Sequence, residues 1–88
     1  MAWTVELTPE ARAGLKEIGA ADAKRILKFL AERLEGRDNP RDTGKALKGS
    51  LREYWRYRVG DYRLFCRLED MIVTVFVVHV AHRREAYK

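Results

Sequence analysis

The feature that most constrains the fold is a ten-residue stretch, residues 54–63, in which arginines alternate with aromatic and apolar side chains. Successive side chains of a strand point to opposite faces of a sheet, so Arg56 and Arg58 share one face. The glycine–aspartate pair at 60–61 is typical of a tight turn, and Arg63 follows it on a returning strand. The stretch therefore predicts a hairpin that brings three guanidinium groups within reach of one polyanionic ligand, because the guanidinium fork matches phosphate.

The remainder of the chain shows the periodicities of one α+β domain that covers residues 1–88. Thr8 and Pro9 form a typical helix start, and Gly19 and Gly36 stand where two successive helices would end. The order β-α-α-β-β-β predicts a helical hairpin packed on one face of a small antiparallel sheet, with the other face free to bind. The expected elements are a strand at 2–7, helices at about 8–18 and 21–35, a loop at 37–50 with a short helical turn near 45–48, strands at 53–60, 62–69 and 71–80, and a polar tail at 81–88.

Charge is distributed unevenly along the chain, whose net charge is +5. Residues 1–44 hold 8 basic and 8 acidic side chains, whereas residues 45–88 hold 10 basic and 5 acidic ones. The whole excess therefore lies in the half that contains the predicted hairpin. Such an asymmetry favours an anionic partner, most commonly nucleic acid.

Composition also excludes several classes of protein. The longest apolar run, at 71–81, is interrupted by Thr74 and His79 and is too short to span a bilayer, so we expect no membrane partner. One cysteine, Cys66, cannot form an internal disulfide, and its position between Leu64 and Leu68 predicts a small core residue. The first residues lack the pattern of a secretory signal, so we expect a cytoplasmic protein. One cysteine and two histidines predict no metal site and no cofactor.

Three segments together resemble the RelE/ParE superfamily of bacterial and archaeal toxins. They are Leu-Lys-Gly at 47–49, Tyr-Arg-Val-Gly-Asp-Tyr-Arg at 57–63 and His-Arg-Arg-Glu-Ala-Tyr at 82–87. The length and the order of elements match as well, so the resemblance covers essentially the whole chain. It implies the RelE-like fold and the toxin of a type II toxin–antitoxin pair.

The resemblance leaves two activities open. RelE-type toxins cleave messenger RNA in the ribosomal A site, whereas ParE-type toxins poison DNA gyrase without nuclease chemistry. The basic and aromatic residues that RelE-type toxins carry match five positions here, which favours the RelE branch: Arg56, Arg58, Arg63, Arg83 and Tyr87. The implied partners are the ribosome, messenger RNA and a RelB-like antitoxin, with two toxins bridged by an antitoxin dimer. A member that only binds RNA or its antitoxin is a third reading.

The expected chemistry is metal-independent RNA cleavage by attack of the 2′-hydroxyl on the adjacent phosphate. This reaction needs a base, an acid and cations that stabilise the phosphorane. We assign the cationic role to Arg63 and Arg83, and phosphate binding to five further basic residues: Arg56, Arg58, Lys45, Lys48 and Arg52. Tyr87 would stack on a base or hydrogen-bond near the scissile phosphate.

The general base is not specified by the sequence. Many RelE relatives have lysines where this chain has Arg56 and Arg58, and an arginine cannot give up its proton. His82 and Glu85 are the nearest titratable candidates. Alternatively, the ribosome supplies part of the chemistry. His79 alternates with a row of valines, which predicts a structural histidine, and the arginines could simply protect an edge strand from aggregation.

Overall fold

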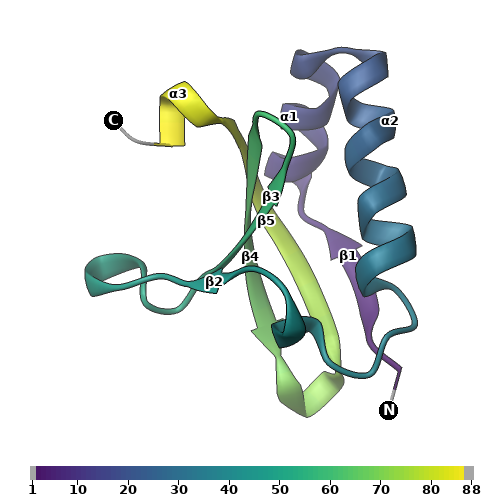
Figure 1. Cartoon of the computed structure of the whole chain (residues 1–88), viewed down its shortest axis with the longest axis vertical. Coiled ribbons are helices and arrows are strands. Elements are labelled where there is room, and N and C mark those ends of the chain that lie inside the picture. The colour runs from purple at the N-terminus through teal and green to yellow at the C-terminus, as the bar shows by residue number, and fades with distance from the viewer. Residues whose placement is uncertain (1, 87–88) are drawn as a thin grey trace.

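A helical hairpin covers one face of a five-stranded sheet in the computed structural model, which describes residues 2–86 (Figure 1). The segment before β3 and the short helix α3 lie on the side of the sheet away from the hairpin. The predicted α+β class and RelE-like arrangement are therefore confirmed. The helices and strands are β1 (Thr4–Leu7), α1 (Pro9–Ile18), α2 (Ala20–Phe29), β2 (Lys45–Ala46), β3 (Trp55–Val59), β4 (Tyr62–Glu69), β5 (Thr74–His82) and α3 (Arg83–Ala86).

The first long helix begins and ends where local sequence signals predict, whereas the α-helical part of the second ends at Phe29, before the expected end at about residue 35. The Thr8 side chain accepts a hydrogen bond of 3.2 Å from the backbone N–H of Ala11, which caps α1. Gly19 ends that helix with a φ of 95°, a conformation that glycine adopts readily. After α2 the chain continues as a π-helical turn, Leu30–Leu34, before Gly36. Among the described residues, no helix has the length and apolar character needed to cross a membrane.

The sheet is mixed, which corrects the predicted antiparallel sheet. Its strand order is β1-β5-β4-β3-β2, and β3, β4 and β5 form the predicted antiparallel meander. However, β1 pairs with β5 in parallel, with Thr4 opposite Thr74 and Leu7 opposite Val77. Side-chain alternation predicts that residues 2–7 form a strand but carries no information about the direction of its neighbour. That direction follows from the crossover through the helices.

The core lies between the helical hairpin and one face of the sheet. Tyr57, Leu64 and Cys66 are completely buried there and pack against helical side chains such as Ile26. The predicted core position of Cys66 is therefore confirmed, and burial raises the pKa of its thiol to about 12. Because inward-facing residues of β3 alternate with arginines, burying Tyr57 directs Arg56 and Arg58 to the opposite face.

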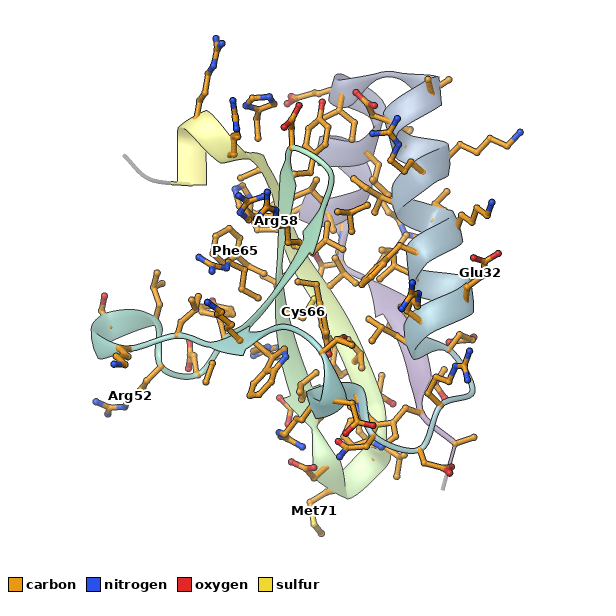
Figure 2. The ribbon with its side chains drawn as sticks, viewed as in Figure 1. Glu32, Arg52, Arg58, Phe65, Cys66 and Met71 are labelled. Carbon is orange, nitrogen blue, oxygen red and sulfur yellow. The ribbon has the colours of Figure 1, made fainter. Side chains whose placement is uncertain are left out.

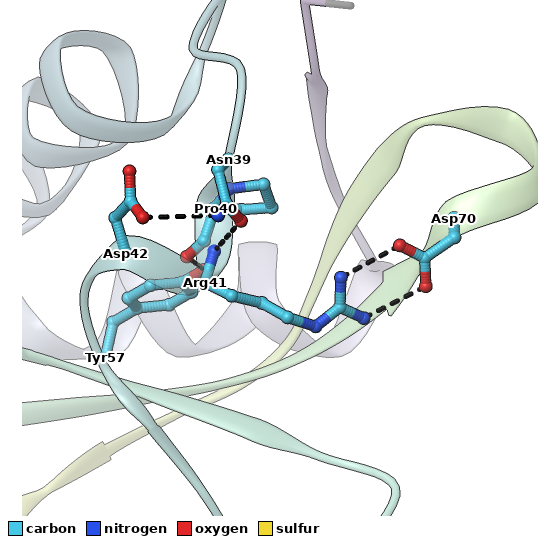
Figure 3. Close-up of polar contacts among 6 residues, drawn as sticks. All are labelled: Asn39, Pro40, Arg41, Asp42, Tyr57 and Asp70. Carbon is cyan, nitrogen blue, oxygen red and sulfur yellow. Dashed lines mark hydrogen bonds and ion pairs between the residues drawn. The ribbon is translucent and has the colours of Figure 1, made fainter.

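The segment between α2 and β3 differs from the predicted loop. Lys45 and Ala46 form a short strand paired with β3, rather than a helical turn. Single-turn 3₁₀ helices flank it at Pro40–Asp42 and Gly49–Leu51. The Tyr57 hydroxyl donates a 2.6 Å hydrogen bond to the Pro40 carbonyl, and these contacts tie the segment to the sheet (Figure 3).

A second tie joins this segment to the far end of the meander. The Arg41 guanidinium donates two hydrogen bonds to the Asp70 carboxylate, at 2.8 and 3.0 Å (Figure 3). The hydrogen bond from Arg41 lowers the pKa of Asp70. Asp70 belongs to a 3₁₀ turn, Asp70–Ile72, followed by Val73 at a φ of 50°, so the β4–β5 connection is longer than the tight turn predicted at 69–70.

Candidate functional site

The open face of the sheet carries two rows of side chains that run across the strands. Figure 2 shows Arg58 and Phe65 pointing away from the helical hairpin, whereas Glu32 lies on its outer surface. Residues directly opposite each other on paired strands share a face, so the rows follow from the register. One row consists of Arg58, Arg63 and Ala81, and the other of Lys45, Arg56, Phe65 and His79. The predicted grouping of the three arginines of the hairpin is thus confirmed.

Arg58 and Arg63 form a like-charged pair opposite each other on β3 and β4. Arg58 is exposed, but only 4% of Arg63 is, and its Nη1 donates a 3.2 Å hydrogen bond to the carbonyl of Tyr62. Like charges in this position destabilise a sheet by roughly 0.2–1 kcal/mol. An arginine pair held at this cost is well suited to bind an anion between its two forks.

Arg83 lies at the same end of the sheet as this pair. Its backbone N–H donates a 2.6 Å hydrogen bond to the carbonyl of Asp61, in the turn between β3 and β4. Its Nε is 3.9 Å from Asp61 Oδ1, a loose ion pair whose side chains are 57% and 67% exposed. Val59 and Tyr62 form the cross-strand pair next to that turn, and Arg58 and Arg63 form the following pair. The structure therefore brings three of the predicted site arginines to one end of the sheet.

A pocket of ≈ 300 Å³ adjoins the arginine pair on the same face. Its walls include Glu10, Leu51, Tyr54, Phe65, His79 and Ala81. Nδ1 of His79 is 3.7 Å from Oε2 of Glu10, and the His79 ring lies 5.9 Å from the Phe65 ring, centroid to centroid.

The expected alternation of His79 with the valines on one face of the strand is wrong, whereas its role as a structural histidine stays a prediction. Phe65 pairs with His79 but Cys66 pairs with Val77, so the register shifts between these positions and β5 has an extra residue. Such a bulge reverses the alternation of the strand. Val75 and Val77 consequently face the core, whereas His79 faces the pocket with 48% of its side chain exposed.

His82 is not brought to the arginine pair. It lies opposite Tyr62 on β4, and the two rings meet edge to face at 5.4 Å. The Tyr62 hydroxyl donates to Asp22 of α2, so this contact lies on the side of the helical hairpin. Nδ1 of His82 accepts a 3.2 Å hydrogen bond from the backbone N–H of Arg84.

The remaining predicted site residues lie away from the arginine pair, or their side chains lie outside the part of the chain that the structure describes. Lys48 and Arg52 are exposed on the segment between β2 and β3, and Arg52 points outward from its tip (Figure 2). Glu85 is described only as a backbone position in α3, and Tyr87 lies outside the described residues. No three His, Cys, Asp or Glu side chains in the described part of the chain are grouped closely enough to hold a metal ion.

Sequence reasoning missed Phe65, His79 and Glu10 as members of the site. Phe65 stands two residues after Arg63, so strand alternation alone would have placed it beside the arginine pair. His79 has no such signal, because the bulge that turns it outward is a property of strand pairing. Glu10 joins the pocket only because α1 begins next to β5.

The fold and the site define a small domain that presents an arginine-lined sheet face opposite a helical hairpin. The model of the ParE toxin family of the type II toxin–antitoxin system parDE matches residues 5–87. Toxin RelG of Mycobacterium tuberculosis is 31% identical over 88 residues, which cover 100% of this chain and 99% of that protein. The chain therefore belongs to the RelE/ParE superfamily of type II toxin–antitoxin toxins.

Solved structures agree with this assignment. A chain of the toxin–antitoxin complex RelBE2 from M. tuberculosis superposes with a TM-score of 0.85 and 30% identity, covering 94% of this chain and 93% of that one. A mutant of the E. coli toxin RelE in the free state gives a TM-score of 0.76 at 24% identity, with coverages of 99% and 90%. At that lower identity the likeness concerns the fold alone.

Proposed function

We propose that this toxin is a ribosome-dependent endoribonuclease that cleaves messenger RNA in the A site. The observation that carries the proposal is the opposed pair of Arg58 and Arg63, with Arg83 at the same end of the sheet. Guanidinium groups gathered at one end of the sheet suit the scissile phosphate, whose charge increases during the reaction, and the phosphates that flank it.

The proposed reaction needs no covalent step on the protein. The 2′-hydroxyl oxygen attacks the adjacent phosphorus, the bond to the 5′-oxygen breaks, and a 2′,3′-cyclic phosphate and a 5′-hydroxyl remain. The 2′-hydroxyl proton goes to a base, and an acid protonates the departing 5′-oxygen. Arg63 and Arg83 stabilise the charge on the phosphorane, and Arg56 and Arg58 hold the flanking phosphates.

The proposal assigns the cations to this chain and part of the proton transfer to the ribosome. Arg56 and Arg58 cannot act as bases. The His82 ring packs on Tyr62 at the helical side, so its participation would require a rearrangement of the chain end. Glu85 and Tyr87 keep their proposed roles as the base candidate and the residue that contacts the RNA.

A RelB-like antitoxin is the proposed inhibitor of this chain. Supporting it, the similar RelBE2 structure from M. tuberculosis is a toxin–antitoxin complex, and another solved structure is the intact E. coli RelBE toxin–antitoxin complex. We expect an acidic antitoxin segment to cover the arginine face, because the positive charge of this chain is concentrated there. Two toxins bridged by an antitoxin dimer in the cytoplasm is the proposed assembly.

Expression of the chain without an antitoxin, followed by mapping of messenger RNA 5′ ends, tests this function. We expect cuts within translated codons, and a loss of about a hundredfold or more in cutting for Arg63→Ala and Arg83→Ala. Arg33→Ala, which removes an exposed arginine from the helical side, is the matched control and should cut normally. Arrested growth with intact messages would contradict the proposal.

A ParE-like inhibitor of DNA gyrase is the second candidate function. The family model that matches residues 5–87 is that of ParE toxins, and this match is the observation that favours it. Gyrase inhibition predicts that messages stay intact while the expressed chain provokes a DNA-damage response. The same expression experiment therefore separates the two activities.

A further inference from the structure

The pocket beside the arginine pair has a lining that phosphate binding does not require. Phe65, Tyr54, Leu51 and Ala81 give it aromatic and aliphatic walls on a face that is otherwise rich in arginine. Phe65 and Tyr54 are only half-buried, although aromatic side chains of this size gain most from complete burial. An aromatic surface left open next to a cationic row is typical of sites that bind single-stranded nucleic acid.

The charges in the pocket favour a base over a phosphate. Glu10 contributes a carboxylate, which repels phosphate but accepts hydrogen bonds from the amino groups of bases. His79 lies beside it, with Nδ1 at 3.7 Å from Oε2, too long for a direct hydrogen bond. Both polar groups therefore keep hydrogen-bonding capacity for a ligand in the pocket.

The distance between the arginine pair and the pocket suits one nucleotide. Arg63 and Phe65 are two residues apart on β4 and face the same side, which separates them by about 7 Å along the strand. A phosphate bound between Arg58 and Arg63 would leave its attached base next to the Phe65 ring. The arginine pair and the pocket thus form one continuous surface for a single strand.

We propose that this pocket binds one unpaired base of the message next to the phosphate held by the arginine pair. Phe65 provides the stacking surface, and Glu10 with His79 binds the edge of a base that carries an amino group. The pocket consequently favours adenine and cytosine, whose amino groups donate to the Glu10 carboxylate, over uracil, whose single donor on this edge is the imide N3–H. This inference rests on the proposed function, because it names the part of the RNA that the site binds.

Binding of short RNAs to the intact chain, followed by NMR chemical-shift titration, tests the proposal without any cleavage. The probes are trinucleotide RNAs with adenine, cytosine or uracil in the middle position, and one with an abasic middle position that keeps every phosphate. We expect the adenine and cytosine probes to bind about tenfold more tightly than the abasic one, in line with the effect of a stacked base. Equal affinity for all four probes would overturn the proposal.

Single substitutions separate the contribution of the base to RNA binding from that of the phosphate. Phe65→Leu keeps an apolar side chain but removes the aromatic face, so it should abolish the preference over the abasic probe. Arg58→Gln should weaken all four probes by the same factor. Glu10→Gln should reduce the preference over uracil, whereas Glu17→Gln, an equal charge change at the far end of α1, should leave it unchanged.

The outcomes distinguish this inference from the proposed function. Base-dependent binding in a chain that leaves messages intact would retain the pocket and contradict the nuclease. If the chain cleaves messages but its Phe65→Leu variant still binds the base-containing probes more tightly than the abasic one, the nuclease proposal stands and the base-binding pocket is wrong. A Phe65→Leu variant that weakens only antitoxin binding would identify the pocket as a protein-docking site, and the proposal would then be wrong.

Discussion

At the scale of single residues, the open face brings together side chains of like charge that repel each other in the free protein. Arg58 and Arg63 stand directly across from each other, and Arg63 is almost entirely buried. Like charges directly opposite each other on paired strands repel, so the pairing of Arg58 with Arg63 is not explained by the stability of the sheet. Such conflicts are concentrated at functional sites, where a bound anion would relieve them.

Replacing Arg58 by glutamine should therefore stabilise the chain. Removing one of two like charges should raise the free energy of unfolding by roughly 0.2–1 kcal/mol at low salt. The gain should shrink at 1 M salt, where the screening length falls to about 3 Å. Urea denaturation at both ionic strengths measures the effect. Arg67→Gln is the control, because Arg67 is exposed on β4 opposite Phe76, without a like charge across from it; equal gains in both variants would contradict the argument.

Alternation along residues 54–63 was sufficient to predict which arginines share a face. When a strand residue such as Tyr57 is buried, the residues on either side of it in the sequence face the opposite side of the sheet. This dependence involves only neighbouring residues in the sequence. The burial of Arg63 depends on the strands and turns around it, so alternation could not predict it. Alternation predicted the wrong face for His79 for a related reason. A bulge depends on how two strands pair, so the sequence of either strand alone does not reveal it.

At the scale of elements, the segment before β3 depends on a glycine that fits closely against the sheet. Gly44 has a φ of 81°, and the Trp55 Nε1–H donates a 2.8 Å hydrogen bond to the carbonyl of the preceding Thr43. A methyl group on Gly44 would lie 2.5 Å from Trp55 Nε1 and 2.6 Å from the Arg56 carbonyl oxygen. This close approach allows β2 to pair with β3 and to present Lys45 beside Arg56.

Gly44→Ala should accordingly destabilise the chain by about 2 kcal/mol or more. The left-handed backbone costs roughly 1–2 kcal/mol for a residue with a side chain, and overpacking adds about 1–3 kcal/mol. Gly49→Ala is the matched control, because Gly49 has a φ of 66° but nothing lies within 4 Å of an added methyl group. It should show the backbone cost alone. Thermal unfolding of both variants tests this, and equal losses would show that the contact with Trp55 is unimportant.

The boundaries of α1 were predictable because capping residues act within one turn, whereas the change to a π-helical turn after Phe29 has no such local signal. Thr8, Pro9 and Gly19 have the positions that their local conformations require. The helical turn expected near 45–48 was wrong because pairing with β3 outweighs the helix propensity of lysine and alanine. The parallel pairing of β1 was not predictable from local signals either, since its partner strand β5 lies seventy residues further along the chain, with Thr4 opposite Thr74.

At the scale of the whole molecule, charge and burial separate into layers. The second half of the chain supplies β3, β4 and β5, and it carries the entire excess of positive charge. The helical hairpin, from the neutral first half, covers the core face of that sheet, and β1, from the same half, extends the sheet beside β5. The charge asymmetry of the sequence thereby becomes an asymmetry between the two faces, and it leaves the basic face available for a polyanion.

The core between these layers contains two acidic protons, on Cys66 and Tyr57, whose release would place a charge in the interior. Burial raises the pKa of both groups, that of Cys66 from 9.0 to about 12. A raised pKa in the folded state means that the neutral group contributes stability fully below the unfolded pKa. That contribution is lost as the pH rises through the folded pKa.

The free energy of unfolding should therefore fall steeply above pH 9, and Cys66 should account for part of the fall. At pH 10.5 the thiol would be ionised in the unfolded chain but neutral in the folded one, a difference of about 2 kcal/mol. Urea denaturation of the wild type and of Cys66→Ala between pH 7 and 10.5 measures this contribution. The variant should be less stable at pH 7, because it loses buried volume, but the gap should narrow or reverse by pH 10.5. A constant gap over this range would mean that the Cys66 thiolate is tolerated in the folded core, and that the two layers are packed less tightly around Cys66 than its complete burial indicates.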